Sequence, residues 1–368
     1  MVRRVPLLLA FLGLGLPARP LLAQGPAPAA GVALPTVLSP AEREGILKAL
    51  AEALRERYVF PEVAERVCAG LAAKAKAGAY AGAADPATLG KWLTADLRAL
   101  GADRHFEVRV EPDFKPQTLA EEDAPPTPQE VIETRQGAAA RGFGVSRVER
   151  LPGNVGVLEV RGFWPVDLAA PALDAAFALL AGSRGLILDL RRNRGGRPEA
   201  VSYLLSHCFA EGDARHLNDI FDRPRNRTRQ FWTSPVPGPR FTGPIIVLTS
   251  AATFSGGEEC AYDLQQQKRA TIMGEVTGGG ANPGGLAALG QGLVAFIPSG
   301  RSINPISKTN WEHVGVKPDM AVPAAEALKA AQVALLERFV GEEQDPEERQ
   351  ALAAVLAKVR KGEAEGPR

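Results

Sequence analysis

Apolar strand-like segments alternate with helix-length segments through the middle of the chain, and this alternation constrains the fold most. The apolar segments are Val155–Val160, Gly185–Leu190, Pro244–Thr249 and Ala270–Gly274. Helix-length segments separate them at residues 168–180, 199–208 and 256–267. Parallel strands need a crossover connection, usually a helix, and burial on both faces makes them continuously apolar. The sequence therefore predicts an α/β core with a largely parallel sheet covered on both faces.

The segments on either side of this core have different patterns. Residues 39–111 begin with the capping sequence Ser-Pro-Ala-Glu and continue with apolar residues at helical spacing, which predicts a small helical module. Residues 112–141 start with a stretch rich in proline and acidic residues, which is typical of a connecting loop or linker. We assign the α/β core to residues 142–340 and a charged C-terminal tail to residues 341–368, which we expect to form a surface helix that frays at its end.

The first 24 residues have the pattern of a secretory signal peptide. Arg3 and Arg4 precede the apolar run Val5–Leu16, and the small residue Ala23 marks a cleavage position. The run is short and interrupted, so an uncleaved membrane anchor is the less favoured alternative. Residues 25–38 are rich in proline, alanine and glycine and are predicted to be a flexible linker. We expect a secreted or periplasmic protein with no stable membrane insertion after cleavage.

Charge and cysteine content exclude several classes of function. A formal net charge of +1 gives no basic surface of the kind that binds nucleic acid. Cys68, Cys208 and Cys260 are odd in number and widely spaced, which predicts buried free thiols and neither a disulfide framework nor a zinc site. We expect no metal and no cofactor. The sequence is compatible with an oligomer.

A serine stands where the third apolar strand gives way to a helix. Ser255 follows a short turn of small residues after Thr249 and precedes Gly256 and Gly257. Parallel sheets bind ligands beyond the carboxyl ends of their strands, and a helix N-terminus offers unpaired N–H groups to a developing oxyanion. The alternative is structural, because Ser255 and Glu258 also have the spacing of a capping box. Ser255 is our candidate nucleophile.

A glycine-ended turn follows the second apolar strand. Asp189-Leu190-Arg191-Arg192-Asn193-Arg194 leads into Gly195 and Gly196, and a helix is predicted after Pro198. The N–H groups of Gly195, Gly196 and Gly256 are candidate donors of an oxyanion hole. An ordinary turn that needs glycine at positive φ is the alternative. The glycine spacing does not match a phosphate-binding loop.

Four motifs in order resemble the C-terminal-processing, or tail-specific, serine peptidase family. They are the turn at 189–196, the Ser255 to Glu258 segment, Gly-Glu-Val-Thr-Gly-Gly at 274–279, and Gly-Val-Lys-Pro-Asp at 315–319. The resemblance covers roughly residues 142–325 and implies a core similar to the crotonase and Clp-type fold. It also implies a serine-type endopeptidase that acts on peptides or unfolded proteins.

One branch of the family fits better than the others. Many members use a serine–lysine dyad, and the lysine is missing from Gly278–Gly280 in this chain. The sequence resembles the tricorn core and the interphotoreceptor retinoid-binding protein repeats, and the tricorn pattern uses a histidine and a late glutamate. His105, in Asp-Arg-His-Phe, and Glu312 match those positions, although Arg104 replaces the tricorn serine. The resemblance therefore implies His105 as general base and Glu312 as its support.

The other three histidines are weaker candidates for the base. We expect His207 to be structural, His216 to lie in a solvated loop, and His313 to be the reserve base beside Glu312. Two other functions stay open. The retinoid-binding relatives suggest a non-catalytic protein that binds an apolar, retinoid- or lipid-like ligand. The crotonase-like core more weakly suggests acyl-CoA chemistry, for which the sequence offers no recognisable CoA site.

Overall fold

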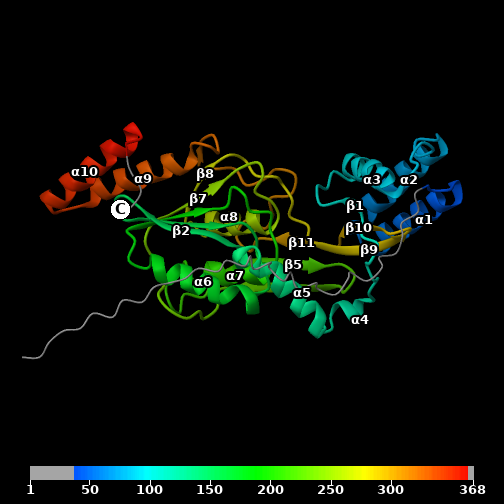
Figure 1. The fold of residues 1–368 in the computed structure, drawn as a ribbon, viewed down its shortest axis with the longest axis horizontal. Coiled ribbons are helices and arrows are strands. Elements are labelled where there is room, and N and C mark those ends of the chain that lie inside the picture. The colour runs from blue at the N-terminus through cyan, green and yellow to red at the C-terminus, as the bar shows by residue number, and fades with distance from the viewer. Residues whose placement is uncertain (1–36, 364–368) are drawn as a thin grey trace, which may run out of the picture.

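The computed structural model describes residues 37–363 and is built around a six-stranded sheet (Figure 1). The strand order is β12-β8-β7-β4-β3-β2. The strands from β12 to β3 are parallel, and β2 at one edge runs antiparallel to β3. The bounds are β2 Val145–Leu151, β3 Val155–Val160, β4 Gly185–Asp189, β7 Ile245–Thr249, β8 Thr271–Gly274 and β12 Met320–Ala321. The predicted parallel sheet is confirmed.

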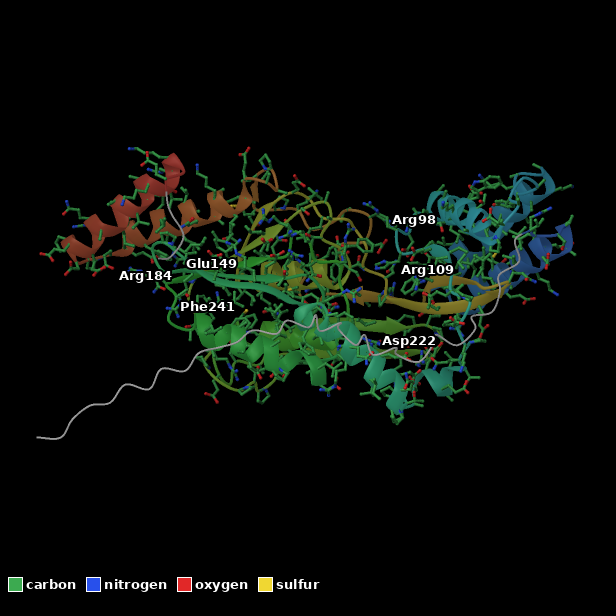
Figure 2. The ribbon with its side chains drawn as sticks, in the orientation of Figure 1. Arg98, Arg109, Glu149, Arg184, Asp222 and Phe241 are labelled. Atoms are coloured by element: carbon green, nitrogen blue, oxygen red, sulfur yellow. The ribbon has the colours of Figure 1, made fainter. Side chains whose placement is uncertain are left out.

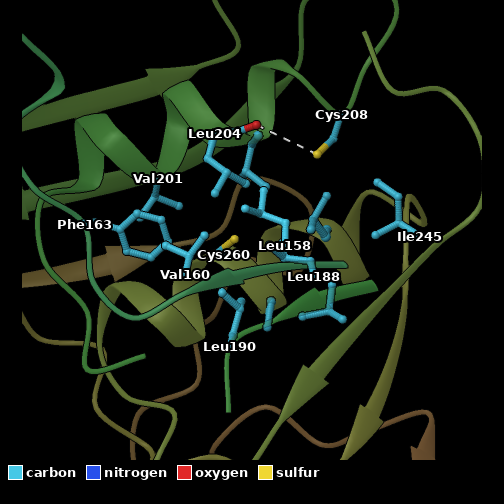
Figure 3. Packing of buried hydrophobic residues seen from close by; sticks show 14 of the residues in the cluster. Leu158, Val160, Phe163, Leu188, Leu190, Val201, Leu204, Cys208, Ile245 and Cys260 are labelled. Carbon is cyan, nitrogen blue, oxygen red and sulfur yellow. Dashed lines mark hydrogen bonds between the residues drawn. The ribbon is translucent and has the colours of Figure 1, made fainter. Parts of the chain in front are cut away.

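Helices cover both faces of this sheet, because successive side chains of a strand point to opposite faces. Leu186 and Leu188 of β4 belong to a core shared with α6, α7 and α8, whereas Ile187 belongs to a core shared with α9 and α10. Figure 3 shows Leu188 in the first of these cores, near Cys260 of α8. The helices are α6 Val166–Leu180, α7 Pro198–Ser206, α8 Gly256–Gln266, α9 Ala327–Glu342 and α10 Pro346–Lys361.

The C-terminal segment is more ordered than a charged tail. Helix α10 buries Leu352, Leu356 and Val359 in the same core as α9. The predicted helix is present, but one of its faces is not on the surface, because the apolar residues recur at helical spacing and form one buried stripe.

The N-terminal module packs three helices on a small sheet at the opposite end of the molecule from α9 and α10 (Figure 1). Its helices are α1 Pro40–Arg57, α2 Pro61–Lys76 and α3 Pro86–Gly101. The predicted capping box forms, since the Glu42 N–H donates to the Ser39 hydroxyl at 3.3 Å and the Ser39 N–H donates to the Glu42 carboxylate at 2.7 Å.

Only one strand of the module's sheet comes from the N-terminal segment. Strand β1 (Glu107–Val110) pairs antiparallel with β10 (Leu293–Pro298), which pairs with β9 (Gly284–Gly290). The apolar side chains of β9 and β10 pack in the same core as α1, α2 and α3. The sequence did not predict that residues within 142–340 would complete this sheet, because strand pairing over such a separation leaves no local signal.

A third sheet joins the module to the core. It has the order β11-β5-β6, with β5 His216–Asp222, β6 Arg227–Trp232 and β11 Gly300–Ile303. Asp222 lies at the end of β5 that faces the module (Figure 2). Next to it, the Arg223 guanidinium donates to the carbonyl oxygens of Tyr58 at 2.8 Å and Arg55 at 2.9 Å, at the C-terminal end of α1.

The connecting segment 112–141 contains two helices, α4 (Leu119–Glu122) and α5 (Pro128–Ala139), and the 3₁₀ turn η1 (Gly142–Gly144) follows it. The three cysteines are buried free thiols, as predicted. The predicted signal peptide and nearly all of the predicted linker at 25–38 lie outside the described residues. Within residues 37–363, no helix is both long enough and apolar enough to cross a bilayer.

Candidate active site

Ser255 occupies a strained turn between β7 and α8. Its backbone has φ 53° and ψ −123°, a conformation that residues with a Cβ rarely adopt. Such strain persists where surrounding contacts hold it, and it is frequent at functional sites. Ser255 also occupies the capping-box position, where the Glu258 N–H donates to the Ser255 carbonyl oxygen at 2.8 Å.

The side chain of Glu258 holds this turn in place through hydrogen bonds. Its carboxylate accepts from the Ser255 N–H at 2.9 Å, the Gly279 N–H at 2.6 Å, the Gly280 N–H at 2.9 Å and the Thr277 hydroxyl at 2.5 Å. Burial raises the pKa of Glu258, and these hydrogen bonds oppose the rise. The sequence showed Glu258 only as a helix cap, whereas in the structure it ties the candidate nucleophile to the glycine stretch at 277–280.

The glycine turn after β4 lies directly against Ser255, because β4 and β7 are neighbouring strands. A Cβ placed on Gly195 would lie 2.7 Å from the Ser255 Cβ and 2.8 Å from the Gly256 nitrogen. A Cβ placed on Gly256 would lie 3.2 Å from the Gly196 nitrogen. Glycine is therefore required in this turn for close approach of two backbones.

The expectation for Gly195 as an oxyanion donor needs correction. Its N–H already donates to the Asn193 side-chain oxygen at 2.7 Å. The Phe163 N–H donates to the Gly195 carbonyl oxygen, and the Arg197 N–H donates to the Phe163 carbonyl oxygen. Among the described residues, the N–H groups of Gly196 and Gly256 are left without an acceptor. These two groups are the candidate oxyanion donors.

His105 enters from the helical module, just before β1. Its ring is almost fully buried, and neither ring nitrogen has a hydrogen-bond partner among the described residues. The ring packs against Phe254, with centroids 4.5 Å apart. Burial lowers the pKa of His105, although the charge of Asp103 acts in the opposite direction. The lowered pKa favours the neutral imidazole, which is the state a general base needs.

Two carboxylates flank this imidazole. An Asp103 oxygen lies 3.7 Å from His105 Nδ1, and Asp103 accepts from the His105 main-chain N–H at 2.9 Å and from the Asn282 amide at 2.9 Å. Glu312 accepts from the Ala281 N–H at 2.5 Å, and its other oxygen is buried without a partner among the described residues. Burial raises the pKa of Glu312 to about 8, and the charge of Asp103 adds to the rise.

Asp103 was absent from the predicted site residues, although it stands two positions before His105 in the sequence. The sequence shows only an acidic residue in a polar turn, and the sequence alone does not tell whether such a residue is buried or exposed. The donor atoms of Asp103, His105 and Glu312 all lie within 4.8 Å of one another. Carboxylate and imidazole donors of this kind suit a divalent ion such as zinc, so these residues are the ones that could hold a metal.

Arg104, which replaces the tricorn serine, links the two parts of the site. Its guanidinium donates to the Gly278 carbonyl oxygen at 2.6 Å. The missing lysine also has a structural explanation. A Cβ placed on Gly280 would lie 2.3 Å from the Phe254 ring and 2.7 Å from the His105 ring. The imidazole and the phenyl ring therefore fill the space that a side chain from Gly280 would need.

Ser255, His105 and the glycine turn line one cavity of about 1330 Å³. Phe163 and Trp164 also line this cavity. No hydrogen bond joins the Ser255 hydroxyl to His105 in this arrangement, since both imidazole nitrogens are unpaired among the described residues. Proton transfer from Ser255 to His105 therefore requires the two side chains to approach each other.

The remaining histidines lie outside this cavity. His207 is buried, stacks on Phe177 and contacts Asp174 at 3.0 Å, which fits the structural role that we expected. His216 is the first residue of β5 and stacks on Trp232, so the prediction of a solvated loop was wrong. His313 is about half exposed, with Nδ1 3.5 Å from Glu312.

The sequence matches two parts of one protein family. Residues 154–322 match Peptidase family S41. Residues 37–140 match the N-terminal domain of Peptidase_S41 in eukaryotic IRBP. The two matches follow one another and together include Ser255, the glycine turn, Glu312 and His105.

Known proteins with similar sequences carry names from the same family. Carboxyl-terminal-processing peptidase 2, chloroplastic, from Arabidopsis thaliana is 28% identical over 193 residues, which cover 48% of this chain and 35% of that protein. The carboxy-terminal-processing protease of Bartonella bacilliformis is 27% identical over 192 residues, with coverage of 50% and 43%. The aligned region thus spans less than half the length of either relative.

A solved structure extends the likeness over most of the fold. A crystal structure from Parabacteroides merdae has a TM-score of 0.55 at 20% identity, and the superposition covers 80% of this chain and 96% of that one. The predicted α/β fold with a helical N-terminal region is therefore confirmed. The two consecutive family matches show that this chain belongs to Peptidase family S41 and has an N-terminal domain of the kind found in that family.

Proposed function

We propose that this protein is an exported serine endopeptidase with Ser255 as nucleophile and His105 as general base. The observation that carries the proposal is the cavity that the strained Ser255, the buried imidazole of His105 and the turn at Gly196 all line. Family membership supports the same chemistry. The predicted signal peptide at residues 1–24 supports export.

In this mechanism the Ser255 hydroxyl attacks the peptide carbonyl carbon and transfers its proton to a ring nitrogen of His105. The N–H groups of Gly196 and Gly256 bind the oxyanion that forms. The protonated imidazole then gives the proton to the leaving amine, and water attacks the acyl-enzyme by the reverse sequence. Asp103 and Glu312 touch no reacting atom and act as positioning residues for the imidazole.

The test is to replace Ser255 by alanine and to assay cleavage of an unfolded protein and of peptides. We expect turnover to fall by at least about a thousandfold, since nucleophile loss removes the covalent step. Ser146→Ala is the matched control, because Ser146 lines the same cavity and has no place in the mechanism. Unchanged turnover in the Ser255 variant would remove this serine from the mechanism.

A serine-reactive phosphonate separates this proposal from apolar-ligand binding. We expect the phosphonate to label the unmodified protein and the Ser146 variant but not the Ser255 variant. A protein that retained a retinoid or lipid and never reacted with the phosphonate would favour the binding function. Export has its own measurement, which is the mature N-terminus determined by mass spectrometry on protein recovered from the secreted or periplasmic fraction.

A further inference from the structure

The cavity around Ser255 has a strong bias in charge. Five arginines line it, and no aspartate or glutamate does so among the described residues. The whole chain carries a net charge of only +1, so the concentration of one sign is local to the cavity. The arginines are Arg141, Arg161, Arg194, Arg197 and Arg229.

Three of these arginines already have partners. Arg161 is paired with Glu159 at 2.8 Å, and Arg229 is paired with Glu199 at 2.7 Å. Arg141 donates to the carbonyl oxygen of its own helix at Gly137 and lies over the Trp164 ring. Glu159 and Glu199 offset the charges of Arg161 and Arg229, and Arg141 is bound to neighbouring groups of the cavity wall.

Arg194 and Arg197 are different. Neither forms an ion pair with an acidic group of the described residues, and both are exposed. They stand immediately before and after Gly195 and Gly196, so they bracket the turn that carries one candidate oxyanion donor. Two arginines without an acidic partner among the described residues therefore flank the turn that lies against Ser255.

The cavity also continues beyond the candidate catalytic centre. A second cavity of about 450 Å³ shares Arg197, Arg229, Pro283 and Gly284 with the first. The combined groove runs from Ser255 toward the β5–β6 hairpin and the helical module. A space of this extent accommodates several residues of an extended peptide, with Arg197 at the junction between the two cavities.

We infer that Arg194 and Arg197 select peptides with aspartate or glutamate side chains close to the scissile bond. This inference rests on the proposed peptidase function and adds the substrate class. A guanidinium presents several N–H donors in a fixed fork that matches a carboxylate. No acidic side chain of the described residues lines the cavity around Ser255. The acidic residues of the second cavity, Glu122, Asp123 and Asp222, are already paired with Arg57 and Arg225, so a substrate carboxylate is the partner that Arg194 and Arg197 lack.

The test uses matched peptides that differ only in Glu or Asp versus Gln or Asn at the positions flanking the cleaved bond. We expect kcat/KM to be about two- to fivefold higher for the acidic peptide at low salt, as for an exposed ion pair. The preference should shrink as ionic strength rises, because salt screens exposed charges. Arg194→Gln combined with Arg197→Gln should bring the ratio close to one.

The control variant removes the same amount of positive charge at positions outside both cavities. Arg66→Gln combined with Arg349→Gln removes two exposed arginines, on α2 and α10, that do not line either cavity. We expect the acidic preference of this variant to match that of the unmodified protein. If both double variants lost the preference equally, the effect would belong to overall charge, and the inference would be overturned.

Two further measurements distinguish this inference from the proposed peptidase function and from recognition of the C-terminal carboxylate of the peptide. Binding of the same peptides to the Ser255→Ala protein, by fluorescence anisotropy, reports selection even where no cleavage occurs. Equal cleavage of acidic and neutral peptides would overturn the inference and leave the peptidase proposal intact. A preference abolished by C-terminal amidation, and insensitive to the acidic side chains, would also overturn it.

Discussion

At the scale of single residues, the site is defined by groups whose surroundings are unusual for their type. Ser255 has a positive φ, His105 is buried with both nitrogens unpaired among the described residues, and Glu312 is a carboxyl group whose pKa burial raises to about 8. Buried polar atoms almost always find partners, so the unpaired imidazole is unusual and supports the role of general base that we propose for it.

Asp103→Asn tests the positioning role proposed for that carboxylate. Burial already lowers the pKa of His105, and the charge of Asp103 opposes this, so removing the charge lowers the pKa further. We expect the acid limb of the kcat/KM profile to move to lower pH by about one unit and kcat to fall by about tenfold or more. Asp113→Asn, at an exposed position, is the control. A fall in rate without movement of the acid limb would indicate a purely structural role.

Gly195→Ala tests the close approach of the glycine turn to the nucleophile. The new Cβ would lie 2.7 Å from the Ser255 Cβ, so the turn or Ser255 must move, and we expect kcat/KM to fall by about a hundredfold. Gly212→Ala is the matched control, because Gly212 also has positive φ but a Cβ added there would meet no atom within 4 Å. Both variants should lose about 1 kcal/mol of stability from backbone strain. Equal activity in the two would argue against this packing.

At the scale of secondary-structure elements, helix α8 carries both the site and a buried acidic face. Its N-terminus presents Ser255 and Gly256, while Glu259 and Asp263 are buried one turn apart on the same helix. Glu259 accepts from the Asn218 amide at 3.1 Å, and Asp263 accepts from the Asn304 amide at 3.1 Å. Burial raises the pKa of both carboxyl groups.

Glu259→Gln tests how this buried acidic face affects the free energy of unfolding. Burial raises the folded-state pKa of Glu259 to about 7, above its ordinary value of 4.5. The stabilising contribution is thus fully present below about pH 4.5 and is lost as pH rises through about 7. We expect the variant to lose less unfolding free energy than the unmodified protein between pH 5 and pH 8, as measured by urea denaturation. Glu44→Gln, on the exposed face of α1, should retain the original slope.

At the scale of the whole molecule, the two halves of the candidate site come from different parts of the chain. His105 belongs to the helical module and Ser255 to the α/β core. The module is held in place by β9 and β10, by the Arg104 contact to Gly278, and by Arg223 at the end of α1. The mechanism that we propose therefore depends on how firmly the module is attached.

Arg223→Gln tests that attachment without touching the cavity. The variant loses a guanidinium that bonds three carbonyl oxygens at the end of α1, and we expect a loss of about 1–3 kcal/mol. Hydrogen exchange should accelerate most in α1, because its C-terminal carbonyl groups lose their partner. Arg227→Gln, in the exposed part of the neighbouring strand β6, is the control and should leave α1 protected. Uniform acceleration across the core would contradict a local attachment role.

The sequence by itself determined the α/β core, because continuous apolar strands and amphipathic helices are local patterns. It also indicated Ser255, His105 and Glu312 through their motifs. Tertiary structure alone decided which glycine N–H groups stay free, since the Asn193 side chain occupies the Gly195 N–H. It likewise decided that β9 and β10 complete the module's sheet and that Asp103 is buried beside His105. Pairing and burial depend on residues distant in the chain, and no local pattern records them.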